Sequence, residues 1–111
     1  MRFIISGTNE LADEITKMAG ERGVICSSFS AFQKDKVTFA MCPDVVAIHV
    51  GDGEELTELV DTCRQKGWSL IHSSGGSDVV ELPKMRGIER YSVTGYVRPT
   101  RFFDLAEVLL H

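Results

Sequence analysis

Residues 45–50 read Val-Val-Ala-Ile-His-Val, and this run constrains the fold more than any other part of the chain. Five of its six side chains are apolar, and polar residues do not alternate with them. A strand with one face in water alternates between apolar and polar residues, whereas a strand covered on both faces is apolar almost throughout. The run therefore predicts a central strand with helices on both faces, which is the environment of a parallel sheet.

Four further apolar segments are expected to form strands, and helical patterns separate them. Leu11, Ile15 and Met18 recur at the i, i+4, i+7 spacing of one helix face, and Gly23 follows as a stop signal. Residues 29–42 fit a helix or a strand, and a helix is favoured because Pro43 and Asp44 follow as a stop signal. The expected strands are 3–5, 24–26, 45–50, 68–72 and 91–97. About five helical segments are expected, with starts near residues 9, 29, 56 and 99, and residues 77–90 are expected to be the least regular part of the chain.

This alternation of strands and helices specifies the fold class. A strand, a helix and a second strand form a βαβ unit, whose right-handed crossover makes the two strands parallel. Repeated along the chain, such units place helices on both faces of one five-stranded sheet. The sequence therefore predicts an α/β fold, a three-layer α/β/α sandwich, as a single domain over residues 1–111.

Composition excludes several classes of protein. The chain is 43% hydrophobic and 25% charged, as is typical of soluble globular domains. Its net charge of −4 argues against a nucleic-acid partner, and no segment approaches the ~20 apolar residues of a membrane span. Cys26, Cys42 and Cys63 are odd in number and widely spaced, which predicts buried or half-buried thiols and no zinc site. Residues 1–7 are too short for a signal peptide, so a reducing cytoplasm is the expected location.

The carboxyl ends of the strands are where ligands of such folds bind. There the chain carries Ser6, Gly7, His49, His72 and Ser73, but no GxGxxG, GxxxxGK[ST] or GxSxG motif. The two histidines end neighbouring strands and are expected to approach each other. No HxH or HExxH spacing supports a metal site. No catalytic residue, metal or cofactor is therefore predicted.

Charge is unevenly distributed along the chain. Residues 51–62 contain five acids and no base, whereas residues 84–102 contain five bases and one acid. The second segment therefore has a net charge of +4 and the remainder −8. Charge runs usually form solvated faces, and that alternative stays open. As a function, we expect the basic segment to bind an acidic protein partner, such as the acidic helix of a second copy.

Three segments resemble the receiver domain of bacterial response regulators. Residues 43–49 (PDVVAIH) are similar to the PDLVLLD third strand of that family, and residues 52–56 (DGEEL) to the DGxEL start of its next helix. Residues 95–105 (GYVRPTRFFDL) are similar to the GYxxKPF segment that ends its fifth strand. The resemblance extends to the element order over nearly the whole chain. It implies the strand order 2-1-3-4-5 that receivers share with flavodoxin.

The residues that receivers use for phosphoryl transfer are replaced in this chain. His49 stands where receivers carry the phosphoaccepting aspartate, and Ser6 and Gly7 stand where they carry the acidic pair that holds Mg²⁺. Arg98 takes the place of their lysine, and Ser73 that of their small hydroxyl residue. Without three carboxylates, Mg²⁺ lacks a cage of hard oxygen ligands. The resemblance therefore implies that these five residues form a degenerate phosphorylation pocket.

The function implied is that of a pseudo-receiver, a signalling or scaffold domain that acts by phosphorylation-independent protein–protein interaction or by self-association. Receivers contact their partners through a surface that corresponds to residues 79–110 here, where the bases concentrate. The expected interaction surface comprises Lys84, Arg86, Arg90, Tyr96 and Arg101. The alternative is a small Rossmann-like domain that binds a nucleotide or another anionic ligand at the strand ends, through residues 7–9 and 73–76.

Overall fold

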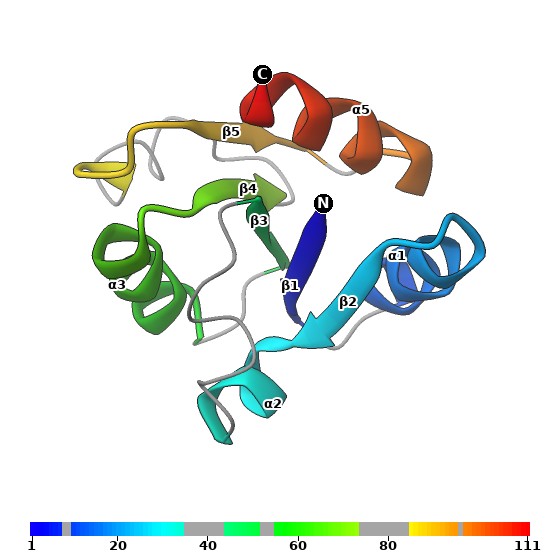
Figure 1. The fold of residues 1–111 in the computed structure, drawn as a ribbon, viewed down its shortest axis with the longest axis horizontal. Coiled ribbons are helices and arrows are strands. Elements are labelled where there is room, and N and C mark those ends of the chain that lie inside the picture. Colours follow the sequence, from blue (N-terminus) through cyan, green and yellow to red (C-terminus); the bar gives the residue numbers. More distant parts are fainter. Residues whose placement is uncertain (8–9, 35–43, 52–54, 74–84, 96) are drawn as a thin grey trace.

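The computed structural model describes residues 1–7, 10–34, 44–51, 55–73, 85–95 and 97–111. Five parallel strands form one sheet in the order β2-β1-β3-β4-β5 (Figure 1). The strands are β1 (Arg2–Ser6), β2 (Ile25–Ser28), β3 (Val45–Val50), β4 (Ser69–Ser73) and β5 (Tyr91–Thr94). The described helices are α1 (Glu10–Glu21), α2 (Phe29–Lys34), α3 (Leu56–Lys66) and α5 (Pro99–Leu110).

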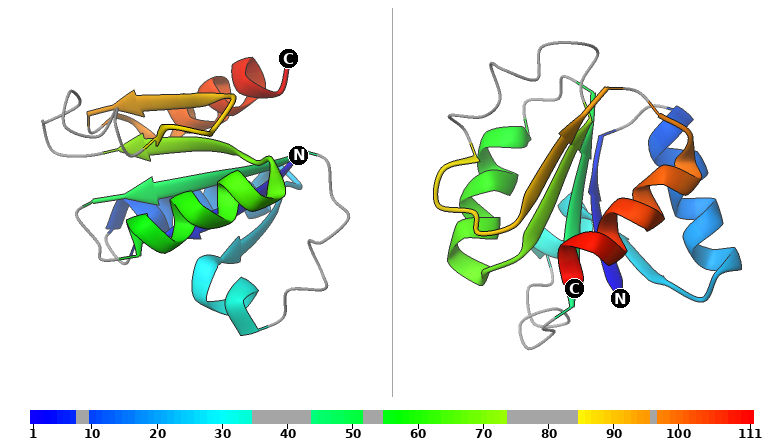
Figure 2. Two further views of the ribbon diagram at one scale, coloured as in Figure 1. Left: turned by 90° about the vertical axis from the view of Figure 1, so that its left-hand side faces the viewer. Right: turned by 90° about the horizontal axis from the view of Figure 1, so that it is seen from above.

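The helices cover both faces of the sheet (Figures 1 and 2). Helices α1 and α5 pack on one face, and α3 and the short α2 pack on the other. The prediction of a three-layer sandwich with strand order 2-1-3-4-5 is therefore confirmed. These layers and this strand order define the flavodoxin-like α/β fold. Among the described helices, none is both long enough and apolar enough to cross a membrane.

Strand β3 occupies the centre of the sheet, as its apolar sequence predicts. All six of its residues are buried, and it pairs with β1 on one side and with β4 on the other. Val45 and Ala47 pack toward α2 and α3, whereas Val46, Ile48 and Val50 pack toward α1 and α5. Successive side chains of a strand point to opposite faces, so this one segment joins the two halves of the core.

Some element boundaries differ from the expected ones, for local reasons. Strand β5 ends at Thr94 and not at residue 97, because Thr94 pairs with Ser73, the last residue of β4, which is its neighbour in the described sheet. Strand β4 begins one residue late, because the N–H groups of Gly67 and Trp68 both bond the carbonyl of Cys63 and close helix α3. In the expected helix at 29–42, residues 29–34 are helical, and residues 35–42 lie outside the described residues.

Cys63 gives the fold a testable dependence on pH. Its side chain on α3 is 1% exposed, and burial raises the pKa of its thiol to about 12. In the unfolded chain the thiol has its ordinary pKa of 9.0 and loses its proton near that pH. The neutral buried thiol therefore contributes its full stabilisation to the folded state below pH 9. Between pH 9 and about 12 that stabilisation declines by about 1.4 kcal/mol per pH unit.

Urea unfolding of the wild type and Cys63→Ala between pH 8 and 10.5 measures this effect. The variant is less stable at pH 8 because it loses buried contacts, and the difference from the wild type narrows as the pH rises. A constant difference in the free energy of unfolding across this pH range would contradict the raised pKa of the Cys63 thiol.

Candidate functional site

A row of three buried polar side chains crosses the sheet at the carboxyl ends of its central strands. Ser6 of β1 pairs in register with His49 of β3, and His49 pairs with His72 of β4. Each lies two residues after an apolar residue that packs toward α2 and α3, so all three point to that face. They are at most 1% exposed. Buried polar groups need partners within the protein, so their contacts define the site.

A hydrogen-bonded chain links this row to the start of α3. The Ser6 hydroxyl donates to Oε2 of Glu55 at 2.7 Å, and Nδ1 of His49 lies 3.0 Å from the same Ser6 oxygen. A carboxylate only accepts hydrogen bonds, and a hydroxyl has a single proton to donate. Since that proton goes to Glu55, we infer that His49 carries a proton on Nδ1 and donates it to Ser6.

His72 extends the chain by ring stacking. The centroids of the His49 and His72 rings are 5.2 Å apart, and the ring planes differ by 21°. The sequence-based expectation that these histidines approach each other is confirmed. Two stacked imidazoles, a hydroxyl and a carboxylate thus form one continuous polar cluster, which we call the polar chain (Glu55, Ser6, His49 and His72).

Two glycines shape the backbone beside the polar chain. Gly7 follows β1 with a φ of 124°, and an added Cβ would collide with the carbonyl oxygen of Val50. Gly51 follows β3 with a φ of 90°, and its N–H bonds the carbonyl of Ser73 at 2.9 Å. Side chains rarely adopt such φ values, so glycine is required where β1 and β3 end this close together.

The five residues of the expected degenerate pocket are only partly brought together. Ser6 and His49 are hydrogen-bonded, and Gly7 is adjacent to Ser6. Ser73 follows His72, so it points to the opposite face of the sheet, where its Oγ donates to the carbonyl of Gly95 at 3.1 Å. Arg98 is exposed at the residue before α5.

Glu55 belongs to the site, although the sequence indicated it only as one acid of a charged run and as part of the DGxEL-like segment. The sequence feature that could have identified Glu55 is its place in the chain. It follows β3 and directly precedes α3, so it had to lie near the carboxyl edge of the sheet. Asp52 and residues 74–76, which also follow strand ends, lie outside the described residues. In the described part of the chain, no group of three or more His, Cys, Asp or Glu side chains is placed to hold a metal ion.

The expected basic surface is spread over both ends of α5. Arg90 precedes β5, and its Nη1 donates to the carbonyl of Leu109 at 2.9 Å, where a cation suits the negative end of the helix. Arg101 is exposed in the first turn of α5. Arg86 is exposed in the turn before β5, and its carbonyl accepts a hydrogen bond from Arg64 of α3. Lys84 and Tyr96, the other two expected residues, lie outside the described residues.

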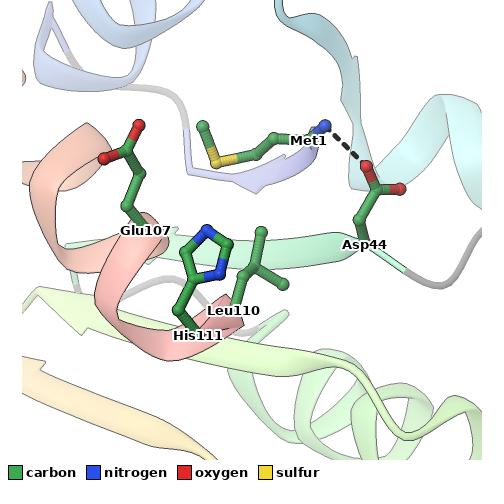
Figure 3. A pocket seen from close by; sticks show the side chains of 5 residues that line it. All are labelled: Met1, Asp44, Glu107, Leu110 and His111. Carbon is green, nitrogen blue, oxygen red and sulfur yellow. Dashed lines mark ion pairs between the residues drawn. The ribbon is translucent and has the colours of Figure 1, made fainter.

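A pocket of about 340 Å³ lies at the opposite, amino end of the sheet (Figure 3). It is lined by Met1, Asp44, Glu107, Leu110 and His111. The amino group of Met1 lies 2.6 Å from Asp44, and this hydrogen bond lowers the pKa of the Asp44 carboxyl. The pocket is therefore separate from the polar chain, which lies at the carboxyl end.

The fold and the polar chain define a flavodoxin-like domain with a buried polar cluster at the carboxyl ends of its central strands. No protein-family model, curated protein or solved structure matches this chain. The fold is therefore established by the structure itself, and the function must be argued from the site.

Gly7 offers a direct test of the close approach of β1 and β3. Gly7→Ala combines a collision with the Val50 carbonyl and an unfavourable φ, so we expect a loss of about 2 kcal/mol in the free energy of unfolding. The matched control is Gly20→Ala in α1, where no described atom lies within 4 Å of the added Cβ. There the substitution is expected to stabilise the fold by about 0.5–1 kcal/mol. Equal effects of the two substitutions on urea unfolding would refute the close approach of Gly7 to the Val50 carbonyl.

Proposed function

We propose that the chain is a degenerate receiver-like domain, which acts in signalling or as a scaffold through phosphorylation-independent protein–protein contacts or self-association. The observation that carries the proposal is the state of His49. It is the penultimate residue of the central strand β3, where the resemblance places the phosphoaccepting aspartate, and it is fully buried and hydrogen-bonded to Ser6.

The chemistry of phosphoryl transfer supports this proposal. A receiver uses a carboxylate nucleophile and carboxylates that hold a divalent cation against the developing charge. Here the position of the nucleophile is an imidazole, and Ser6 supplies a hydroxyl that is already bonded to Glu55. The other position of the acidic pair, Gly7, has no room for any side chain. The residues at this edge therefore suit packing better than group transfer.

The outer surface supplies groups of the kind that bind proteins. Tyr91 of β5 is 39% exposed and Val108 of α5 is 73% exposed, and both are large apolar side chains. Arg90 adjoins Tyr91 in the chain, and Arg101 lies two turns before Val108 on the same helix. Arginine and aromatic residues are enriched in protein interfaces. This combination favours a protein partner with acidic groups around an apolar centre, or a second copy of the chain.

Two finer parts of the proposal have separate support. A cytoplasmic location is supported by Cys26 and Cys63, which are free thiols. The Rossmann-like alternative is supported by Arg98, which is exposed where α5 begins and is a cation suited to an anionic ligand. Residues 8–9 and 74–76, on which that alternative also depends, lie outside the described residues.

The absence of a phosphorylation response is the first test of the proposal. Addition of Mg²⁺ with beryllofluoride or acetyl phosphate is expected to leave the amide NMR spectrum unchanged. An active receiver domain treated in the same way serves as the positive control. Shifts of amides near His49, Gly51 and Ser73 on addition of the reagents would show a working pocket and overturn the proposal.

The basic surface is tested by charge reversal. If the partner is a second copy, the sedimentation coefficient of the wild type rises with protein concentration. Arg101→Glu then weakens the association about tenfold or more, because it removes a favourable charge from the interface. Lys17→Glu, on the exposed face of α1, is the matched control and leaves the association unchanged. Equal weakening by both variants would show that net charge and not this surface controls association.

A further inference from the structure

Strand β5 forms one edge of the sheet, because it is the last strand in the order β2-β1-β3-β4-β5 (Figure 1). It pairs with β4 on one side, and no strand in the described part of the chain pairs with its other side. The outer side of an edge strand carries backbone N–H and C=O groups, which form a template for pairing with another strand. The outer edge of β5 is therefore a candidate interaction surface.

The hydrogen bonds to β4 determine which backbone groups lie on this outer edge. The N–H of Leu70 in β4 donates to the carbonyl of Arg90 at 3.2 Å, and Leu70 lies in register with Tyr91. In a parallel ladder, this bond and this register direct the N–H and C=O of Ser92 toward β4. The groups of successive residues alternate between the two sides, so those of Tyr91 and Val93 point outward from the sheet.

Strand β5 lacks the features by which natural proteins keep a sheet edge from pairing. Such edges are blocked by charged side chains, by proline or by bulges. Strand β5 reads Tyr-Ser-Val-Thr, without charge or proline, and its four residues pair with β4 in unbroken register. Tyr91 is 39% exposed, and tyrosine, valine and threonine favour strands. Glu89 and Arg90 precede the strand with opposite charges, so two identical edges can approach without net repulsion.

The opposite edge strand, β2, is less suited to pairing. Its last residue, Ser28, directly precedes α2. The Ser28 carbonyl accepts a hydrogen bond from the Ser27 hydroxyl at 3.3 Å, and the Ser28 hydroxyl accepts one from the N–H of Ala31 at 3.1 Å. These contacts engage the end of β2 in the start of α2. Strand β2 therefore serves as the comparison edge, and its Ile25 is 51% exposed.

We propose that β5 pairs antiparallel with β5 of a second copy of the chain, about a two-fold axis at Ser92. Tyr91 of each copy then lies opposite Val93 of the other and exchanges both of its backbone hydrogen bonds with it. The pairing thus satisfies the outward groups of both strands and joins the two sheets into one. At the axis the two Ser92 residues face each other with Cα atoms about 4.5 Å apart, a separation that suits small side chains.

This inference deepens the proposed function and rests on its self-association, because it names the strand through which two copies meet. A contact of one surface with itself about a two-fold axis is the commonest arrangement in homo-oligomers. The pairing uses main-chain groups at the edge of the sheet, whereas Arg101 and Val108 lie on α5, which covers one face. Substitutions on β5 and on α5 therefore separate the two contacts.

Sedimentation and amide hydrogen exchange at increasing protein concentration test the pairing in the wild type. The sedimentation coefficient is expected to rise toward that of a dimer. As the dimer forms, exchange at Tyr91 and Val93 slows about tenfold or more, because their N–H groups become hydrogen-bonded. The N–H of Ser92 is directed toward β4 in the monomer, so its exchange changes little and provides the internal reference.

Val93→Pro removes one outward N–H from the edge. Proline is tolerated on an edge strand where its nitrogen faces solvent, so the ladder between β5 and β4 is expected to remain. The self-association should weaken about tenfold or more, because a donor of the pairing is lost. Urea unfolding of the variant shows whether the monomer keeps its fold.

A charge exchange at the axis provides a second test, which stands even if Val93→Pro does not fold. Ser92→Lys and Ser92→Glu each place two like charges opposite each other, so each variant alone should associate about tenfold or more weakly. An equimolar mixture of the two variants brings opposite charges together and should restore the association. The matched control is Ile25→Lys on β2, which leaves the association unchanged.

Four results separate the pairing from the proposed function. A wild type that stays monomeric at every concentration would overturn the pairing and leave a different protein as the partner. Weakening by Arg101→Glu but not by the β5 variants would place the contact on α5, and weakening by Ile25→Lys would place it on β2. Either result overturns the pairing and supports self-association. A response to acetyl phosphate in a wild type that pairs through β5 would reject the phosphorylation-independent function and leave the pairing in place.

Discussion

The burial of β3 on both faces is the constraint on which the rest of this structure depends. Its side chains fill two separate apolar layers in turn, so each layer needs its own helices, and α1 with α5 and α2 with α3 supply them. The same strand carries His49 into a place that water does not reach. A polar group there must find its partners inside the protein, which accounts for Ser6 and Glu55 beside it.

The fold could be predicted from sequence where the pattern depends on burial alone. Strand β3 has the bounds that its apolar run indicates, and α3 stops where Gly67 adopts the left-handed conformation that ends helices. Strand β5 could not be placed in the same way. Its length depends on how far its neighbour β4 extends. Strand β4 ends at Ser73, which pairs with Thr94, and the sequence of β5 itself does not indicate this end.

The candidate site could also be predicted only in part. That Ser6 and His49 meet, and that His49 meets His72, follows from parallel strands ending at one edge. The position of Ser73 did not follow, because a shift of one residue along a strand moves a side chain to the other face. Glu55 was missed because its place before α3 puts it near this edge but does not fix its contact with Ser6, which depends on how its side chain turns.

Gly7 has a consequence for how this domain can change in evolution. Any other residue there meets the Val50 carbonyl in a backbone conformation that side chains avoid, so a substitution at 7 is accepted only if the end of β3 moves as well. The residue after β1 and the end of β3 are therefore expected to change together or not at all.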